Sequence, residues 1–170
     1  MKITLFMAMS VNGIIAKENE DEDFLSDENW KTFKGLAENC GCFIIGRRTY
    51  ENVKEWEDHS FNEIKNSDML ILSKKDMKIT GCTIVNSPKE AIQKAKEKGC
   101  KELLLSGGGI TNTSFIKENL IDEIILNIEP AILGKGIKIF KENDFEKRLK
   151  LINTKNLKED IMQLHYKVIK

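Results

Sequence analysis

The chain has 170 residues, of which 41% are hydrophobic and 32% charged, and its 27 basic residues equal its 27 acidic ones. This length predicts one domain, residues 1–170, with a sizeable buried core. The zero formal net charge provides no overall field for nucleic acid or an anionic membrane, and no apolar stretch reaches the roughly 20 residues of a membrane span.

The first part of the chain alternates apolar runs with segments of helical character. Residues 2–9 (KITLFMAM) form an apolar, β-prone run that predicts a buried strand. After an acidic, loop-like stretch, Ser26 or Asp27 can cap a helix that ends near Gly41. A short apolar run at 42–46 (CFIIG) predicts the next strand, and a second helix begins directly after it.

The middle of the chain repeats this alternation. Further buried strands are expected at 69–73, 82–85 and 102–106. Ser87, followed by a proline and eventually a glycine, marks a helix between the last two of these strands. The final helix is expected to begin after three consecutive glycines and to reach about Leu120.

The last third of the chain contains strand-like segments without helices (DEIILNIEPAIL, LKLINTKNL and DIMQLHYKVIK). Strands that alternate with helices and are almost wholly apolar predict a largely parallel sheet that is covered on both faces. The terminal segments add an antiparallel part. The sequence therefore predicts an α/β fold with a mixed sheet.

Three of the predicted strands end in residues suited to an anion. They are followed by Gly46-Arg47-Arg48-Thr49, Ser73-Lys74-Lys75 and Ser106-Gly107-Gly108-Gly109. Ligands of such sheets bind at the carboxyl ends of the strands. Helix-start amides, guanidinium groups and hydroxyls all bind phosphate well, although each segment alone could also be a solvated turn. The glycines match neither the P-loop nor the dinucleotide-binding fingerprint. The remaining functional interpretation is that their backbone amides form a nest that binds a pyrophosphate.

Side chains for acid–base or nucleophilic catalysis are scarce. His59 lies in a polar segment that predicts a surface loop, and His165 alternates within the terminal strand as a half-buried residue would. Asp27 and Glu28, at the start of a helix, could supply a proton, although helix starts favour acidic residues in any case. A phosphate-binding set without an evident nucleophile indicates that a bound cofactor carries the chemistry, and hydride transfer fits this profile.

The cysteines and the N-terminus predict a cytoplasmic protein. The stretch MKITLFMAMSVNGIIA indicates a strand and a turn rather than a secretion signal. Four cysteines in a reducing compartment are expected to be free thiols. They are Cys40, Cys42, Cys82 and Cys100. Since no second cysteine pair or nearby histidine completes a zinc site, no metal is expected.

Four segments, in register, resemble the dihydrofolate reductase-like superfamily. They are MAMSVNGIIA, CFIIGRRTYENV, LLLSGGGITNTSFIKENLIDEIILNIEPAILGKGIKIF and DIMQLHYKV. Within that superfamily they are most similar to the branch that contains the reductase domain of the bifunctional riboflavin-biosynthesis deaminase-reductase and its small stand-alone relatives. The resemblance spans essentially the whole chain. It implies a three-layer fold, a mostly parallel eight-stranded sheet and NADPH as the cofactor.

The resemblance also implies which positions hold the cofactor. Ala8, Ile15 and Ala16 would line the nicotinamide end. The pyrophosphate and the 2′-phosphate would be met by residues from the three strand ends: Gly46, Arg47, Arg48, Thr49, Ser73, Lys74, Gly107, Gly108, Gly109 and Ile110. The basic side chains among these residues favour NADPH over NADH.

The residues expected on the substrate side differ from those of both the dihydrofolate reductases and the riboflavin-pathway reductases. The Pro-Trp pair of dihydrofolate reductases is absent, and Met7 stands where the riboflavin-pathway reductases usually carry a lysine. The usual arginine of the following helix is not evident either. The candidate substrate-binding residues are Met7, Ser10, Trp30, Asn127 and Glu129, and the candidate catalytic acids are Asp27 and Glu28.

These features predict an NADPH-dependent reductase that acts on a 5-amino-6-(5-phosphoribosylamino)uracil-like compound. One alternative is dihydrofolate reduction, and another is a non-catalytic nucleotide-binding module of the same fold. The expected partner is a small aminopyrimidine or pterin, with no nucleic acid and no membrane. By analogy with relatives, a homodimer is expected through the exposed edge of the antiparallel C-terminal part.

Overall fold

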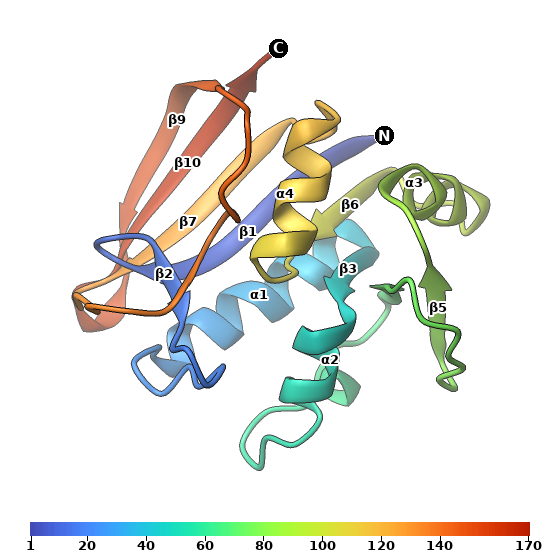
Figure 1. Ribbon diagram of the computed structural model, residues 1–170, viewed down its shortest axis with the longest axis horizontal. Coiled ribbons are helices and arrows are strands. Elements are labelled where there is room, and N and C mark those ends of the chain that lie inside the picture. Colours follow the sequence, from blue (N-terminus) through green and yellow to red (C-terminus); the bar gives the residue numbers. More distant parts are fainter.

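The structure, a computed structural model, describes residues 1–170 and centres on one eight-stranded sheet (Figure 1). Its strands are β1 (Lys2–Ser10), β3 (Cys42–Gly46), β4 (Asp68–Leu72), β5 (Cys82–Val85), β6 (Glu102–Leu105), β7 (Glu123–Glu129), β9 (Arg148–Asn156) and β10 (Met162–Ile169). Their order in the sheet is β5-β4-β3-β6-β1-β7-β10-β9. All neighbours pair in parallel except β10, which is antiparallel to both β7 and β9. The predicted mixed sheet is therefore confirmed.

Four helices lie against this sheet (Figure 1). They are α1 (Asp27–Cys40), α2 (Arg47–Val53), α3 (Pro88–Glu97) and α4 (Gly109–Lys117). None of them is long and apolar enough to cross a membrane. Short 3₁₀ turns occur at η1 (Phe61–Glu63) and η2 (Lys158–Asp160). Ser87 caps α3 as predicted, because its Oγ accepts a hydrogen bond from the Glu90 amide at 3.2 Å.

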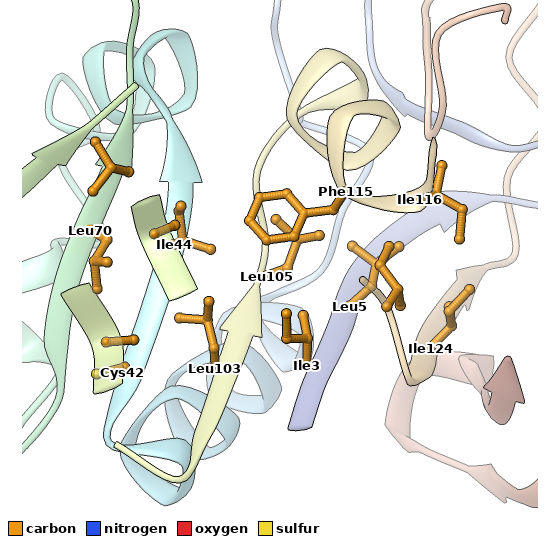
Figure 2. Packing of buried hydrophobic residues seen from close by; sticks show 14 of the residues in the cluster. Ile3, Leu5, Cys42, Ile44, Leu70, Leu103, Leu105, Phe115, Ile116 and Ile124 are labelled. Carbon is orange, nitrogen blue, oxygen red and sulfur yellow. The ribbon is translucent and has the colours of Figure 1, made fainter. Parts of the chain in front are cut away.

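The two faces of the sheet carry separate hydrophobic layers, because successive side chains of a strand point to opposite faces. On one face, Ile3 and Leu5 of β1 belong to the same buried cluster as Phe115 and Ile116 of α4 (Figure 2). On the other face, residues of the central strands pack with Phe33 and Ala37 of α1. Burial on both faces explains why the central strands are almost wholly apolar in sequence.

Two details of the fold differ from the sequence-based expectation. A small second sheet pairs β2 (Ile14–Ala16) with β8 (Ile137–Lys138), and α4 ends at Lys117 rather than near Leu120. The partners of the small sheet are more than a hundred residues apart in the chain. Segments this short carry no hydrophobic periodicity of their own, so only the tertiary fold defines them.

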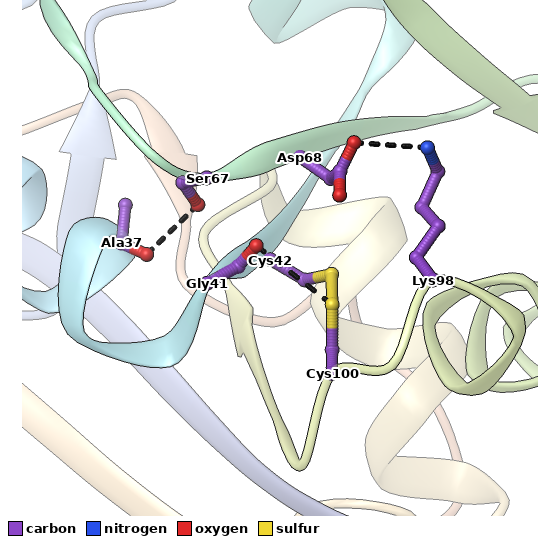
Figure 3. The surroundings of a disulfide bond; sticks show 7 residues. All are labelled: Ala37, Gly41, Cys42, Ser67, Asp68, Lys98 and Cys100. Atoms are coloured by element: carbon purple, nitrogen blue, oxygen red, sulfur yellow. Dashed lines mark hydrogen bonds and ion pairs between the residues drawn. A yellow bond between two sulfur atoms is a disulfide. The ribbon is translucent and has the colours of Figure 1, made fainter.

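The prediction of four free thiols is wrong for two of them. Cys42 and Cys100 form a disulfide, whereas Cys40 and Cys82 are free (Figure 3). Cys42 begins β3, and Cys100 precedes β6, the parallel neighbour of β3, so the pairing of the strands brings the cysteines together. The nearby Asp68 carboxylate accepts a hydrogen bond from Lys98 at 2.9 Å. Local spacing had singled out only Cys40 and Cys42 as a close pair.

The strand β9 forms one edge of the sheet, with β10 as its single neighbour. All nine of its residues are exposed, including the large apolar side chains of Leu149, Leu151 and Ile152. Such an edge has unpaired backbone groups that a second chain could pair with. The homodimer expected from the sequence stays a prediction, and β9 is the surface on which it depends.

Candidate functional site

The three strand ends singled out in the sequence lie side by side. The strands β4, β3 and β6 are consecutive and parallel in the sheet, so their carboxyl ends meet at one edge. A cavity of about 670 Å³, here called the strand-end cavity, opens at this edge. Most of the predicted cofactor-binding residues line it: Ile15, Ala16, Gly46, Arg47, Arg48, Thr49, Ser73, Lys74, Gly108, Gly109 and Ile110. Their role as cofactor ligands stays a prediction.

Two of the three consecutive glycines, Gly107 and Gly109, serve close backbone packing. A Cβ on Gly107 would lie 2.6 Å from the backbone nitrogen of Gly46, and one on Gly109 would lie 2.5 Å from the carbonyl oxygen of Lys138. Gly107 is buried and does not line the cavity, unlike the expectation from the sequence. The Gly108 amide donates a hydrogen bond to Thr49 Oγ1 at 3.2 Å, which joins the start of α4 to α2. The glycines therefore bring the α4 N-terminus against the strand ends.

Both arginines of the strand-end cavity pair with carboxylates. Arg47 forms an ion pair with Glu51 one turn further along α2, and Arg48 pairs with Glu20 from the acidic loop after β2. Lys74 is exposed and forms no ion pair. An anionic ligand would exchange with, or bind beside, these carboxylates. The acidic loop is thus in direct contact with the cavity that the sequence predicts to be basic.

A second cavity, here called the aromatic cavity, has a volume of about 490 Å³ and lies between the sheet, α1 and the loop after α2. Aromatic rings form much of its wall: Phe6, Trp30, Phe33, Trp56, His59 and Phe61. The rings of Trp30 and His59 stack, with centroids 4.9 Å apart and planes 15° apart. His59 is therefore not a simple surface residue, since only 23% of its side chain is exposed. The sequence signal was its proximity to Trp56 within a polar segment.

The two candidate catalytic acids occupy different positions. Asp27 lines the aromatic cavity, and its Oδ1 lies 3.2 Å from His59 Nε2. Glu28 does not line the cavity, and its nearest cation is Lys31 at 3.9 Å. Helix geometry explains this difference, because successive residues of α1 point about 100° apart. Of the two, only Asp27 can reach a ligand of this cavity directly, and its role stays a prediction.

Sequence reasoning missed Glu22, which lines both cavities. Burial of its carboxyl, with a smaller contribution from the negative charge of Asp21, raises the pKa of Glu22 to about 7. Its side chain forms no hydrogen bond or ion pair within the protein. No sequence signal distinguishes Glu22, because it lies in a run of acidic residues typical of a solvated loop. The two cavities also share Ile15, Thr49 and Gly108.

The five candidate substrate-binding residues fall into two groups. Met7 and Trp30 line the aromatic cavity. Ser10, Asn127 and Glu129 are buried and line neither cavity, so their role as substrate-binding residues stays a prediction. Ser10 stabilises the turn after β1, since its Oγ donates to Asn12 Oδ1 at 2.8 Å and accepts from the Ile14 amide at 3.0 Å.

Asn127 and Glu129 instead fix the start of α1 to β7. Glu129 Oε1 accepts hydrogen bonds from the Ser26 amide at 3.0 Å, from Ser26 Oγ at 2.9 Å and from the Asn29 side chain. Asn127 Nδ2 donates to Asn29 Oδ1 at 2.9 Å, and Asn127 Oδ1 accepts from Gln163 at 2.9 Å. Ser26 thus binds Glu129 rather than capping its helix with its side chain. Because Ser26 and Asn29 line the aromatic cavity, this network positions part of its wall.

Comparisons with known proteins agree with this architecture. The family model of the RibD C-terminal domain matches residues 1–163. The uncharacterized protein YwjB of Bacillus subtilis is 30% identical over 169 residues, which cover 97% of each chain. The crystal structure of a putative riboflavin biosynthesis protein from Shewanella sp. PV-4 superposes with a TM-score of 0.82 at 23% identity, covering 100% of both chains.

The fold also matches a dihydrofolate reductase. The enzyme from Enterococcus faecalis, solved with NADP(H) and a ligand named RAB-propyl, has a TM-score of 0.77 at 17% identity, covering 99% of this chain and 97% of that one. Identity this low shows the fold alone. The family model goes further, and this chain belongs to the RibD C-terminal domain family.

Proposed function

We propose that this protein is an NADPH-dependent reductase of the riboflavin-biosynthesis type, with NADPH in the strand-end cavity and an aminopyrimidine ring in the aromatic cavity. One observation carries the proposal: the two cavities meet, sharing Ile15, Glu22, Thr49 and Gly108. Hydride transfer requires a cofactor and a substrate to touch at one place, and this junction provides it. Membership of the RibD C-terminal domain family supports the reductase activity.

The residues of the strand-end cavity fit NADPH. Arg47, Arg48 and Lys74 offer positive charge, and the N-terminus of α4 offers backbone amides, which is the donor set that phosphates prefer. A Cβ could not be accommodated at Gly109, so the backbone itself forms this part of the wall. Towards the junction the lining becomes apolar, with Ile15 and Ala16, as a nicotinamide ring requires. When bound there, NADPH would supply the hydride.

The protein's own residues would orient the substrate and control delivery of the proton. Trp30 and the aromatic rings beside it would hold a planar ring, and the buried network of Glu129, Asn29 and Asn127 would keep the start of α1 in place. In the riboflavin-type reaction, hydride would add to C1′ of the ribosyl group, which is bound to the exocyclic nitrogen of the pyrimidine, and the C1′–O4′ bond of the sugar would break. A proton on O4′ would complete the reduction, which gives a ribityl chain.

Dihydrofolate reduction is the second candidate, and Glu22 favours it. A carboxyl whose pKa is about 7 still holds a proton at neutral pH in a large fraction of molecules, so it could protonate a pterin nitrogen at the cavity junction. The riboflavin-type reaction makes no comparable demand for a buried acid. The two candidates share the cofactor and differ in the ring that occupies the aromatic cavity.

The proposal is tested by ligand-induced stabilisation and by turnover. NADPH should raise the melting temperature more than NADH does, because the strand-end cavity offers cations to the 2′-phosphate. Oxidation of NADPH, followed by its absorbance, should then depend on an added aminouracil or on dihydrofolate. NADPH binding without turnover of either compound would favour a non-catalytic nucleotide-binding module. No stabilisation by either cofactor would contradict all of these functions.

A further inference from the structure

We infer that the aromatic cavity selects an unphosphorylated planar nitrogen heterocycle, neutral or positively charged, and rejects its phosphorylated analogues. The inference rests on the proposed function and names the substrate class of the same site. It separates this protein from a reductase of phosphoribosyl compounds, although the heterocyclic ring that is bound could be the same. Three features of the cavity carry it: its charge, its rings and one unpaired carboxyl.

The charged side chains of the aromatic cavity are almost all acidic. Six carboxylates line it: Asp21, Glu22, Asp23, Asp27, Glu57 and Asp58. No lysine or arginine is part of its lining. Asp23 pairs with Lys17 at 2.6 Å, and Asp27 lies 3.2 Å from His59 Nε2, but the other four have no cationic partner within 4 Å. A phosphate group here would meet like charges and would have no cation to bind.

The aromatic rings indicate what the cavity accepts. Trp30 stacks on His59, and Trp56 meets Trp30 edge-on, with centroids 6.3 Å apart. Such walls bind flat rings by stacking, and the electron-rich faces of tryptophan also favour positive charge. A planar heterocycle that is neutral or protonated therefore suits both the rings and the carboxylates.

Glu22 provides an independent indication that a ligand belongs here. Its carboxyl lies at the junction of the two cavities and has no hydrogen-bond or ion-pair partner in the protein. Glu22 is only half-buried, and its carboxyl can exchange water for an N–H group or a ring nitrogen of a heterocycle without giving up a partner in the protein. Glu22 would therefore favour a nitrogen-containing ligand over an anion, as the other carboxylates of the aromatic cavity do.

The neighbouring cavity shows that the protein does place cations where an anion is expected. Arg47, Arg48 and Lys74 all line the strand-end cavity and are absent from the aromatic one. The apolar Met7 also lines the aromatic cavity and adds no charge to it. The basic residues are thus divided unequally between two adjoining cavities, and the division follows the expected location of the cofactor phosphates.

The test is a binding measurement with two probes that differ only by a phosphate. They are 5-amino-6-(ribosylamino)uracil and its 5′-phosphate, titrated against the full chain while tryptophan fluorescence is followed. The chain has two tryptophans, and both line the aromatic cavity, so the signal reports on this site. The unphosphorylated probe should bind at least tenfold more tightly. Raising the salt concentration should narrow the difference, because salt screens exposed charges.

A pair of variants tests whether carboxylates of the aromatic cavity cause the preference for the unphosphorylated probe. The double substitution Glu57→Gln and Asp58→Asn should reduce the ratio of the two affinities at least threefold. The matched control, Asp144→Asn and Glu146→Gln, removes the same charge from exposed residues that do not line the aromatic cavity and should leave the ratio unchanged. The inference would be overturned if the 5′-phosphate probe bound as tightly as the unphosphorylated one or more tightly, or if neither probe bound. It would also be overturned if the Glu57→Gln and Asp58→Asn variant left the ratio of the two affinities unchanged.

The measurement does not depend on turnover, so it is separable from the proposed function. If NADPH stabilises the protein but the phosphorylated probe binds better, the reductase proposal stands and the substrate class is wrong. If the selectivity is found but neither cofactor stabilises the protein, the cavity has the inferred preference and the reductase proposal fails.

Discussion

The strand-end cavity and the aromatic cavity adjoin each other but are built in different ways. The first is made of backbone turns that directly follow β3, β4 and β6, and its cations come from those turns. The second is made largely of side chains from α1 and from the loops that flank α1 and α2, and its charges are carboxylates. A wall of backbone turns that supplies cations suits the constant part of a reaction, the cofactor. A wall of loop residues suits the part that varies between relatives, the substrate.

The backbone origin of the strand-end cavity gives the largest expected effect. Gly107→Ala should lower the free energy of unfolding by about 3 kcal/mol, because the new Cβ would lie 2.6 Å from the Gly46 nitrogen and the backbone would have to move. For a chain of this length, that corresponds to a fall of about 6–12 °C in the melting temperature. Thermal unfolding followed by circular dichroism measures it.

Gly108→Ala is the matched control for this substitution. Its Cβ would be 3.5 Å from Thr49 Oγ1, which is an ordinary contact, and it would point towards the cavities that Gly108 lines. We expect a stability change within about 1 kcal/mol together with weaker NADPH binding. If both variants were equally stable, the close packing of Gly107 would not be what requires a glycine there.

The contrast in construction also explains what the sequence could and could not reveal. The strand ends were predictable because an apolar run followed by Gly46-Arg47-Arg48 or by Gly107-Gly108-Gly109 is a local pattern, and the parallel sheet brings such ends together. The strands of the parallel part before β7 were predictable to within a residue or two for the same reason, whereas the segment expected at 122–133 ends at Glu129, and β2 and β8 were not predicted. The role of Gly107 was not predictable, since it depends on a contact with a turn about sixty residues earlier in the chain.

The aromatic cavity was only partly predictable, because no periodicity marks its residues. His59 and Glu22 lie in polar segments that could equally be solvated loops, and only the packing of those loops against α1 and the sheet gives them a role. Asn127 and Glu129, expected to bind the substrate, lie on β7 and line neither cavity. Whether they contact a ligand or a helix depends on where α1 lies, and the helix covers them.

The cations of the strand-end cavity give the next largest effect. Arg48→Ala should weaken NADPH binding by about 30- to 150-fold, as the loss of a charge-assisted hydrogen bond of about 2–3 kcal/mol requires. NADH binding should change less if Arg48 meets the 2′-phosphate. Isothermal titration calorimetry measures both, and Arg148→Ala, on the distant edge strand β9, is the control. An unchanged affinity for NADPH would remove Arg48 from the cofactor site.

A substitution of Glu20 gives a second test of the role of Arg48 in NADPH binding, because Glu20 forms an ion pair with Arg48. Glu20→Gln should release the guanidinium group and strengthen NADPH binding a few-fold, the opposite sign to Arg48→Ala. Opposite signs would show that the acidic loop competes with the cofactor for Arg48. The same sign for both variants would indicate that the ion pair itself shapes the cavity.

A further expected effect concerns the pH dependence of stability and Glu22, which belongs to both cavities. Burial, and secondarily the charge of Asp21, raises the pKa of Glu22 from 4.5 to about 7 in the folded protein. Between these two pH values the folded state keeps a proton that the unfolded state has lost, so this group makes stability fall as the pH rises from 4.5 to 7. Glu22→Gln removes the ionisation. The variant should match the wild type below pH 4.5 and be about 2 kcal/mol more stable at about pH 8.

Glu18→Gln, an exposed acid of the same loop that lines neither cavity, is the control and should follow the wild-type pH profile. Chemical denaturation across the pH range measures the differences. Parallel curves for Glu22→Gln and the wild type would show that its carboxyl is hydrated, and a hydrated carboxyl could not act as the shared acid of the two cavities. A gap that opens between pH 4.5 and 7 and closes when a heterocycle is added would instead place the ligand against Glu22.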